Sequence, residues 1–305
     1  MGVNCQPKCG NCKCGKCPLV SSNYTLKERE LEMIQARLTY EGGRWIARYP
    51  WIRDPNELPD NKAMVAAKLK SLEDRLGKDP EKNKAYKEQI QDNMLKRKVA
   101  QKIEKNELAE YKGPVHYLSH HPVLKPDSES TPLRIVFNSS ASYKGHVLNE
   151  YVAKGPDLNN NLISLLLRFR RERVALVGDI RKMYHSVGMA EMDQHCHRFL
   201  WRDMQIERSP VVYCVTAVNF GDKPSATIAI CALRKTAEMV KEKFPEAAST
   251  ILHNVYMDDI LDNLESTEEA LKRASQIDEL LKKGNFTIKI KKWIIIGIKM
   301  AAGRG

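Results

Sequence analysis

The sequence predicts an α+β fold in which an antiparallel sheet is backed by helices. Three observations lead to this prediction. Residues 1–24 are rich in Cys, Lys and Gly and lack apolar periodicity, which is typical of a tail. Residues 25–112 repeat apolar side chains at helical spacing, which indicates a helical N-terminal extension. From Gly113 onward, short β-rich runs alternate with helical segments, as they do in α+β domains.

The composition is that of a basic chain that can bury a core. Apolar residues make up 42% and charged residues 29% of the 305 positions, which excludes wholesale disorder. The formal net charge of +12 favours a polyanionic partner. No apolar run reaches the roughly 18 residues of a membrane span. Residues 1–20 hold cysteines and lysines where a signal peptide is apolar. We therefore expect an intracellular, cytoplasmic chain with no membrane partner.

Three helices are expected in the N-terminal extension. The first begins at Thr25, whose hydroxyl can form a capping box with Glu28, and apolar residues then repeat as far as Leu38. A segment rich in Gly, Pro and Trp follows over 41–60, and we expect an ordered loop there. The second helix carries an apolar stripe from Val65 to Leu76 and stops at Gly77. The third helix is expected from about Pro80 to Leu108.

From Gly113 onward, strands and helices are expected in alternation. Asp157 is a candidate cap for one helix, and Ser266 forms a second capping box with Glu269. A fully apolar run ends on Asp179, which predicts a buried strand with a carboxylate at its end. The expected strands are 123–124, 134–137, 174–178 and 211–218, with a hairpin over 256–261 and helices opening near 157, 225 and 266.

Carboxylates in apolar surroundings give the first functional signal. Asp179 ends an apolar strand, and Asp258 and Asp259 occupy the bend of an apolar hairpin. Such groups are costly to desolvate unless a positive charge satisfies them. Carboxylates that converge at strand ends suit Mg²⁺, and a pair of ions about 4 Å apart can promote displacement at phosphorus. The alternative interpretation of Asp258-Asp259 is an ordinary hairpin turn, because Asp is a good turn residue.

The order of these motifs resembles a known family. Asp179-Ile180 with Tyr184, then Phe220 to Ala226, then Tyr256 to Asp259 resemble motifs A, B and C of reverse transcriptases. The chain is most similar to BEL/Pao-type LTR retrotransposons, over most of its length and best from about 113 to 292. The segments that carry this second resemblance are His121–Pro126, Arg134–Ser140, Gly155–Leu158 and Phe199–Arg202.

The resemblance implies a right-hand polymerase in which the fingers precede the palm. Asp179 and Asp258 would hold two Mg²⁺ ions, and Asp259 would complete the acidic cluster. Tyr256 and Met257 would lie under the primer end. Tyr184 matches the aromatic steric gate that excludes ribonucleotides; its alternative interpretation is a core tyrosine.

The same resemblance assigns residues to the incoming dNTP. Arg134 would pair with the triphosphate through bidentate contacts, with Lys125 as a second cation. Gly221 would let the backbone approach the nucleotide and template. Lys289 is a candidate for the lysine that protonates the leaving pyrophosphate, and Lys291 and Lys292 are alternatives. Two further basic runs are Lys96–Lys98 and Arg168–Arg173. Each can contact a template–primer backbone or form a solvated helix face.

The cysteine cluster lies outside the matched motifs. Four thiolates can bind Zn²⁺ tetrahedrally and order a segment that has no core. The alternatives are a flexible linker remnant and, on the cysteines alone, a zinc-ordered interaction module. The candidate ligands are Cys5, Cys9, Cys12, Cys14 and Cys17.

These interpretations divide the chain into four parts and define its expected activity. The parts are a Cys-rich segment 1–24, a helical extension 25–112, fingers and palm 113–292, and a truncated tail 293–305. The expected function is RNA-directed DNA synthesis on an RNA or DNA template–primer, in a virus-like particle by resemblance. We expect a truncated fragment without thumb, RNase H or the other polyprotein segments. The alternative is therefore an inactive nucleic-acid-binding remnant.

Overall fold

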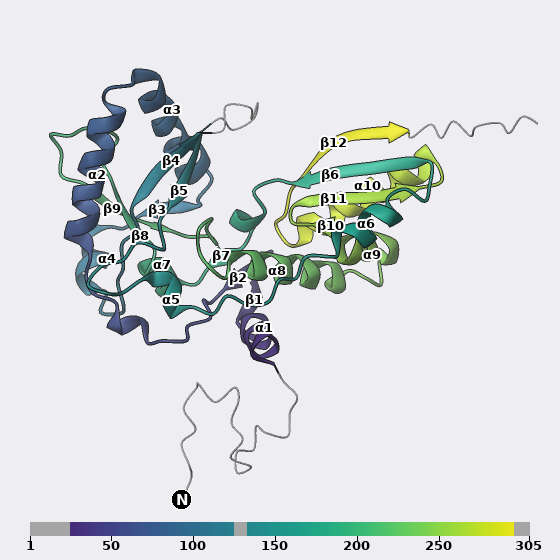
Figure 1. The fold of residues 1–305 in the computed structure, drawn as a ribbon, viewed down its shortest axis with the longest axis horizontal. Coiled ribbons are helices and arrows are strands. Elements are labelled where there is room, and N and C mark those ends of the chain that lie inside the picture. Colours follow the sequence, from purple (N-terminus) through teal and green to yellow (C-terminus); the bar gives the residue numbers. More distant parts are fainter. Residues whose placement is uncertain (1–24, 125–132, 296–305) are drawn as a thin grey trace, which may run out of the picture.

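The computed structural model describes residues 25–124 and 133–295, and the side chains only as far as Lys289 (Figure 1). The described residues form a mixed α+β fold, as the sequence predicts. Two hydrophobic cores lie in separate lobes, and a small sheet and helix α1 lie between them in Figure 1. The candidate zinc ligands and Lys125 lie outside the described residues.

One lobe is built on a four-stranded antiparallel sheet with the order β10-β11-β6-β12 among the described residues. Apolar β6 is central; β11 pairs with it over Val174–Asp179, and β12 pairs with it over Val174–Ile180 with one register shift. Helix α10 packs on β6 and β11 and also contacts α8 and α9, so the sheet is backed by helices (Figure 1). The elements are α6 Leu162–Arg168, β6 Val174–Ile180, η4 Met183–Ser186, α8 Ser225–Met239, α9 Pro245–His253, β10 Val255–Tyr256, β11 Asp259–Leu264, α10 Thr267–Lys283 and β12 Ile288–Ile295.

The other lobe packs helices around a three-stranded sheet, β3-β9-β8, and the hairpin β4-β5. Its core is rich in buried aromatic side chains, including Tyr86, Phe137 and Phe199. The elements are η2 Pro55–Glu57, α2 Lys62–Leu76, α3 Pro80–Ile90, η3 Gln91–Leu95, β3 Ala100–Lys102, α4 Lys105–Glu110, β4 His120–Leu124, β5 Leu133–Phe137, α5 Leu148–Tyr151, α7 Glu191–His195, β8 Arg198–Trp201 and β9 Val211–Val215.

The segment between the lobes corrects the expected first helix and loop. Helix α1 spans Leu26–Ala36 with the predicted Thr25 capping box, but Leu38 belongs to a strand. Strands β1 Leu38–Glu41 and β2 Arg44–Ala47 form a hairpin, and β2 pairs in parallel with β7 Gly188–Met189. The cause is the Gly42-Gly43 turn, whose φ values of 55° and 83° match the backbone that a tight hairpin requires.

The expected third helix is also wrong beyond Leu95. Helix α3 continues into the π-helix η3, and the chain then reverses at Lys98, which has a φ of 55°. The next residues form β3, which pairs with β9 about a hundred residues later. Pairing with a distant strand overrides the helical pattern, so residues 25–112 are not wholly helical.

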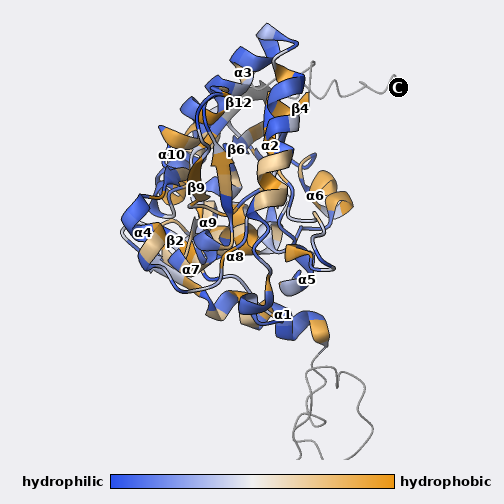
Figure 2. Cartoon of the chain, turned by 90° about the vertical axis from the view of Figure 1, so that its left-hand side faces the viewer, coloured by the Kyte–Doolittle hydropathy of each residue, from blue (hydrophilic) through white to orange (hydrophobic). Residues whose placement is uncertain are grey.

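Most of the helix caps expected from the sequence are present, and one is wrong. Gly77 caps α2 and Gly284 caps α10, and the Ser266 hydroxyl accepts a hydrogen bond from the Glu269 N–H. Asp157 does not cap α6; Asn161 does, because its Oδ1 accepts from the Ser164 N–H at 2.9 Å. Figure 2 colours α6 largely as hydrophobic, whereas α1 is mostly hydrophilic. No helix of the described residues is long and apolar enough to cross a membrane.

Candidate active site

The three candidate carboxylates meet at one end of the sheet of β6 and β11. Asp179 of β6 lies directly opposite Asp259 of β11. Asp258 precedes Asp259 in the turn, and its carbonyl oxygen accepts the Ile180 N–H at 2.7 Å. Residues that oppose each other in an antiparallel pair project from the same face. The register therefore places Asp179 and Asp259 on one face of the sheet, with Asp258 beside them.

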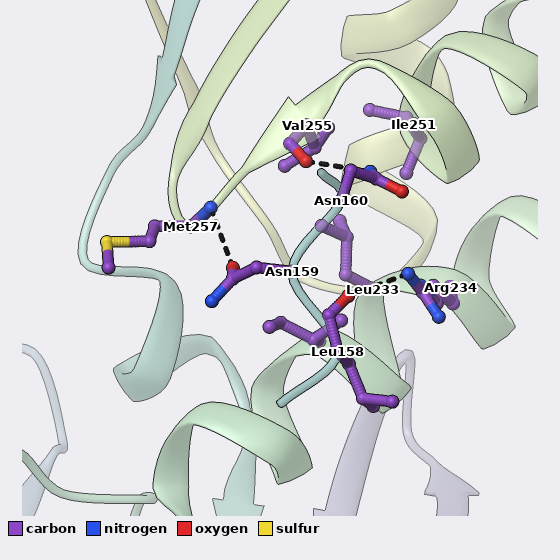
Figure 3. A pocket seen from close by; sticks show the side chains of 9 residues that line it. Leu158, Asn159, Asn160, Leu233, Arg234, Ile251, Val255 and Met257 are labelled. Carbon is purple, nitrogen blue, oxygen red and sulfur yellow. Dashed lines mark hydrogen bonds between the residues drawn. The ribbon is translucent and has the colours of Figure 1, made fainter. Parts of the chain in front are cut away.

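The turn that carries Asp258 is held by a neighbouring segment (Figure 3). The Met257 N–H donates to Asn159 Oδ1 at 3.1 Å, and Asn160 Nδ2 donates to the Val255 carbonyl oxygen at 2.8 Å. Met257 has a φ of 54°, which is unusual for a non-glycine residue. These two asparagines thus secure a tight turn whose conformation is not otherwise favoured. Sequence reasoning missed them, although both follow the Gly155–Leu158 segment directly.

A cavity of about 590 Å³ adjoins the carboxylates and lies between the two lobes. Its lining comes from α3 and η3, the hairpin β4-β5, the end of β6, η4, α8 and β12. The cavity brings together six of the residues predicted from sequence: Arg134, Asp179, Tyr184, Met257, Asp258 and Lys289. Of the other predictions, Asp259 and Tyr256 pair with each other on the β10-β11 hairpin beside the cavity, and Gly221 follows the lining residue Phe220.

Tyr184 lies in η4 against the cavity wall. It is half-buried, and its ring centroid is 4.6 Å from that of Phe220. Burial raises the pKa of the Tyr184 hydroxyl, and the negative charge of Asp258 raises it further. The hydroxyl therefore stays protonated at neutral pH close to a candidate metal ligand.

Basic side chains line the same cavity as the carboxylates. Arg134 is exposed on β5, and Lys289 of β12 lies directly opposite Asp179 of β6. Lys182, in a left-handed conformation with φ 50°, donates a hydrogen bond to Asn93 Oδ1 of η3. The side chains of Lys291 and Lys292, the alternatives to Lys289, lie outside the described part of the structure.

Lys182 is the cation that sequence reasoning missed. Burial, followed by the charges of Arg97 and Arg181, lowers the pKa of its ammonium to about 8. Burial and then Arg181 also lower the pKa of Arg97. The signal in the sequence is the Arg181-Lys182 pair directly after Asp179-Ile180. An anion in the cavity would relieve the mutual repulsion of these three cations.

The donor set at the strand ends fits a hard divalent cation. Mg²⁺ is bound through one or two carboxylates together with substrate phosphates and water, rather than in an all-protein cage. Carboxylates on adjacent strands supply such oxygens. Among the described residues, no group of three or more His, Cys, Asp or Glu side chains lies close enough to hold a metal ion by itself. Substrate oxygens would therefore have to complete the coordination.

Carboxylates on paired strands beside a cation-lined cavity define a site suited to phosphoryl or nucleotidyl transfer. The sequence profile of the family described as "Reverse transcriptase (RNA-dependent DNA polymerase)" matches residues 127–298, which is more than half of the chain. The chain therefore belongs to the reverse transcriptase family.

Two of the solved structures to which the chain is similar are foamy viral proteins. A foamy viral protease–reverse transcriptase in complex with double-stranded DNA is 20% identical, with a TM-score of 0.49 over 68% of this chain and 31% of that chain. The native prototype foamy virus protease–reverse transcriptase is 18% identical, with a TM-score of 0.46 over 68% of this chain and 23% of that chain. This chain thus spans less than a third of either protein. No curated protein matches it.

Proposed function

We propose that this chain is the RNA-directed DNA polymerase domain of a BEL/Pao-type LTR retrotransposon. In the proposed reaction, the 3′ oxygen of a primer loses its proton and attacks the α-phosphorus of a dNTP. The new P–O bond replaces the bond to the β-phosphate, and pyrophosphate leaves. The observation that carries the proposal is that Asp179, Asp258, Tyr184 and Arg134 line one and the same cavity. The finer BEL/Pao assignment rests on the order of the sequence motifs.

Mg²⁺ is the cofactor that this site would use. Asp179 and Asp258 would hold two ions, with Asp259 as the third carboxylate of the cluster. When bound, Mg²⁺ neutralises phosphate charge and favours ionisation of the attacking hydroxyl. The protein's own contribution is to keep the carboxylates on one face through the β6-β11 register and to hold the Met257 turn through Asn159.

The remaining cavity residues divide between the sugar and the phosphates. Tyr184, braced by Phe220, would exclude a ribose 2′-OH. Arg134 would bind the triphosphate, and we add Lys182 as a second cation for it, because Lys125 lies outside the described residues. Lys289 would donate a proton to pyrophosphate. These roles use the cations on the cavity wall for the phosphates and place the α-phosphate toward the carboxylates.

The partner of the chain would be a template–primer duplex. A net charge of +12 favours a polyanion, and Tyr256 and Met257 lie beside the carboxylates, where a primer end would have to reach. The division into a Cys-rich segment, an extension, fingers and palm remains part of this proposal. Strands β3 and β2 of the extension pair with β9 and β7 of the later segment, so we propose that these two parts fold as one body.

Primer extension tests the proposal directly. The full 305-residue chain is incubated with an RNA template, a DNA primer, dNTPs and Mg²⁺, beside an Asp258→Asn variant that keeps the size of the side chain. We expect extension that the variant loses while its nucleic-acid binding and thermal unfolding stay close to wild type. Binding without extension by the wild type would instead support the inactive remnant.

A further inference from the structure

A buried carboxylate lies directly behind the cavity wall. Asp222 follows Phe220-Gly221, and its side chain is 1% exposed. It accepts hydrogen bonds from Tyr49 Oη at 2.6 Å and from Ser139 Oγ, and its Oδ2 lies 3.3 Å from His197 Nε2. Tyr49 follows β2, Ser139 follows β5, and His197 directly precedes β8. Segments from one lobe and from the small sheet between the lobes therefore meet at one carboxylate that does not itself line the cavity.

The polar contacts of the His197 ring define its protonation. Its Nδ1 lies 2.6 Å from the carbonyl oxygen of Asp193, which can only accept, so Nδ1 carries a proton. Its Nε2 faces the Asp222 carboxylate. A neutral ring would direct a lone pair at that carboxylate, whereas an imidazolium places a positive charge there. A carboxylate this deeply buried requires such a counter-charge. The geometry therefore favours an imidazolium.

The charged groups around the ring agree with this assignment. Burial alone would lower the pKa of His197, but the charges of Asp222 and Asp193 and the Asp193 carbonyl raise it overall. Burial would likewise raise the pKa of Asp222, but the charge of His197 lowers it overall. His116 also faces this cluster, and its own low pKa of about 4 keeps it neutral. The Asp193 carboxylate is satisfied by the Tyr49 N–H and by Trp51 Nε1.

The loop above Asp222 forms part of the cavity. Asn219 and Phe220 line it, and Phe220 contacts the Tyr184 ring. Asn219 is buried, and its Nδ2 has no hydrogen-bond partner among the described residues. Gly221 has a φ of 107°, and a Cβ there would lie 2.7 Å from the Phe137 carbonyl oxygen. Residues 219–221 are thus packed tightly between Asp222 and the cavity.

We propose that Asp222 and His197 form a buried ion pair that positions Asn219 and Phe220 for binding of the incoming dNTP. Both are positioning residues, because neither lines the cavity. The proposal rests on the proposed function, since the ligand is the nucleotide of that site. Loss of the pair should therefore weaken nucleotide affinity and leave the chemical step nearly unchanged.

The variants are Asp222→Asn, His197→Gln and the double variant of both, with Glu73→Gln as control. Glu73 forms another buried ion pair, with Arg202, away from the cavity. Steady-state extension and calorimetric titration of dNTP into the protein–template–primer complex give KM, kcat and Kd. For each single variant we expect KM and Kd to rise roughly tenfold with kcat within about threefold. The double variant should recover most of the affinity, because it leaves no uncompensated charge.

The control separates positioning from general stability. Glu73→Gln should lower thermal stability but leave dNTP affinity unchanged. Single variants that are folded at the assay temperature and bind dNTP as wild type does would overturn the positioning role, and so would a loss confined to kcat. Wild-type protein that binds no dNTP would overturn the proposed function itself. ¹⁵N NMR of the His197 ring reports on the pair independently: two protonated nitrogens at neutral pH support it, and a neutral ring overturns it.

Discussion

Asp179 of β6 lies directly opposite Asp259 of β11, and the adjacent Ile180 N–H donates to the Asp258 carbonyl oxygen at 2.7 Å. The pairing continues without a shift from this point to Val174 and Leu264. A slip of one residue would move one carboxylate to the other face of the sheet. The candidate site therefore depends on the whole strand pair rather than on the turn alone.

Removing the ring of Tyr184 should admit ribonucleotides. The ring stacks near Phe220 and borders the cavity, so Tyr184→Ala opens space beside the sugar. Discrimination against ribonucleotides, measured as the ratio of kcat/KM values, should fall by roughly 10- to 100-fold. Tyr184→Phe keeps the ring and should retain discrimination. Equal exclusion of ribonucleotides by the alanine variant would remove the gate role.

Removing the charge of Lys182 should weaken dNTP binding. A charge-assisted hydrogen bond is worth about 1.5 kcal/mol or more, so Lys182→Met should raise the Kd roughly tenfold. The pKa of Lys182 is about 8, and the ammonium is present below it. Wild-type affinity should therefore fall as pH rises through about 8, and Lys182→Arg should flatten this dependence. Lys243→Met, in an exposed ion pair with Glu279, is the control and should bind dNTP as the wild type does.

A methyl group at Gly221 should destabilise the loop behind the cavity. Its Cβ would lie 2.7 Å from backbone at Phe137, and φ is 107°, so Gly221→Ala should cost about 1–3 kcal/mol. Gly145 has φ 79° but open space around it, so Gly145→Ala carries only the backbone strain of about 1 kcal/mol. Denaturant unfolding compares the two variants. A smaller loss of unfolding free energy in Gly221→Ala than in Gly145→Ala would contradict the close packing of this loop.

The charge of His197 predicts how stability depends on pH. Its pKa is raised above 6.5, so its contribution is complete below about pH 6.5 and is lost as pH rises through the folded value. His116, His120 and His195 have pKa values lowered to about 4, so their contributions are lost as pH falls below about 6.5. Thermal unfolding of wild type and His197→Gln between about pH 6 and pH 8.5 isolates the first effect. The difference in melting temperature between the wild type and His197→Gln should narrow as pH rises. A difference that widens would contradict the imidazolium.

Several structural features were predictable because they depend on neighbours in sequence. The Thr25 capping box, the Gly77 and Gly284 helix ends and the hairpin around Asp258 involve residues only a few positions apart. Short apolar runs with a terminal carboxylate likewise predicted β6. Asp157 was a wrong cap because Asn161, four residues later, also satisfies the local rule and is the one that accepts the helix N–H.

Other features depend on segments that meet only in the folded chain. Residues Ala100–Lys102 follow a helical pattern, yet they form β3 because β9 offers unpaired backbone beside them. Lys182 follows Asp179-Ile180 closely in the sequence, but only the folded chain brings Asn93 and Arg97 against it. The contacts of Asp222 with Tyr49 and Ser139 join positions 173 and 83 residues apart.

By itself, the sequence determined the α+β class, the caps at Thr25, Gly77 and Ser266, and the carboxylate and tyrosine motifs, because helix signals, turn signals and strand ends are encoded within a few residues. The tertiary structure alone decided which side chains share the cavity, that Lys182 lines it, and that His197 faces Asp222. The physical reason is that strand register and the docking of two cores set distances between remote residues. Those distances decide burial, charge and therefore chemistry.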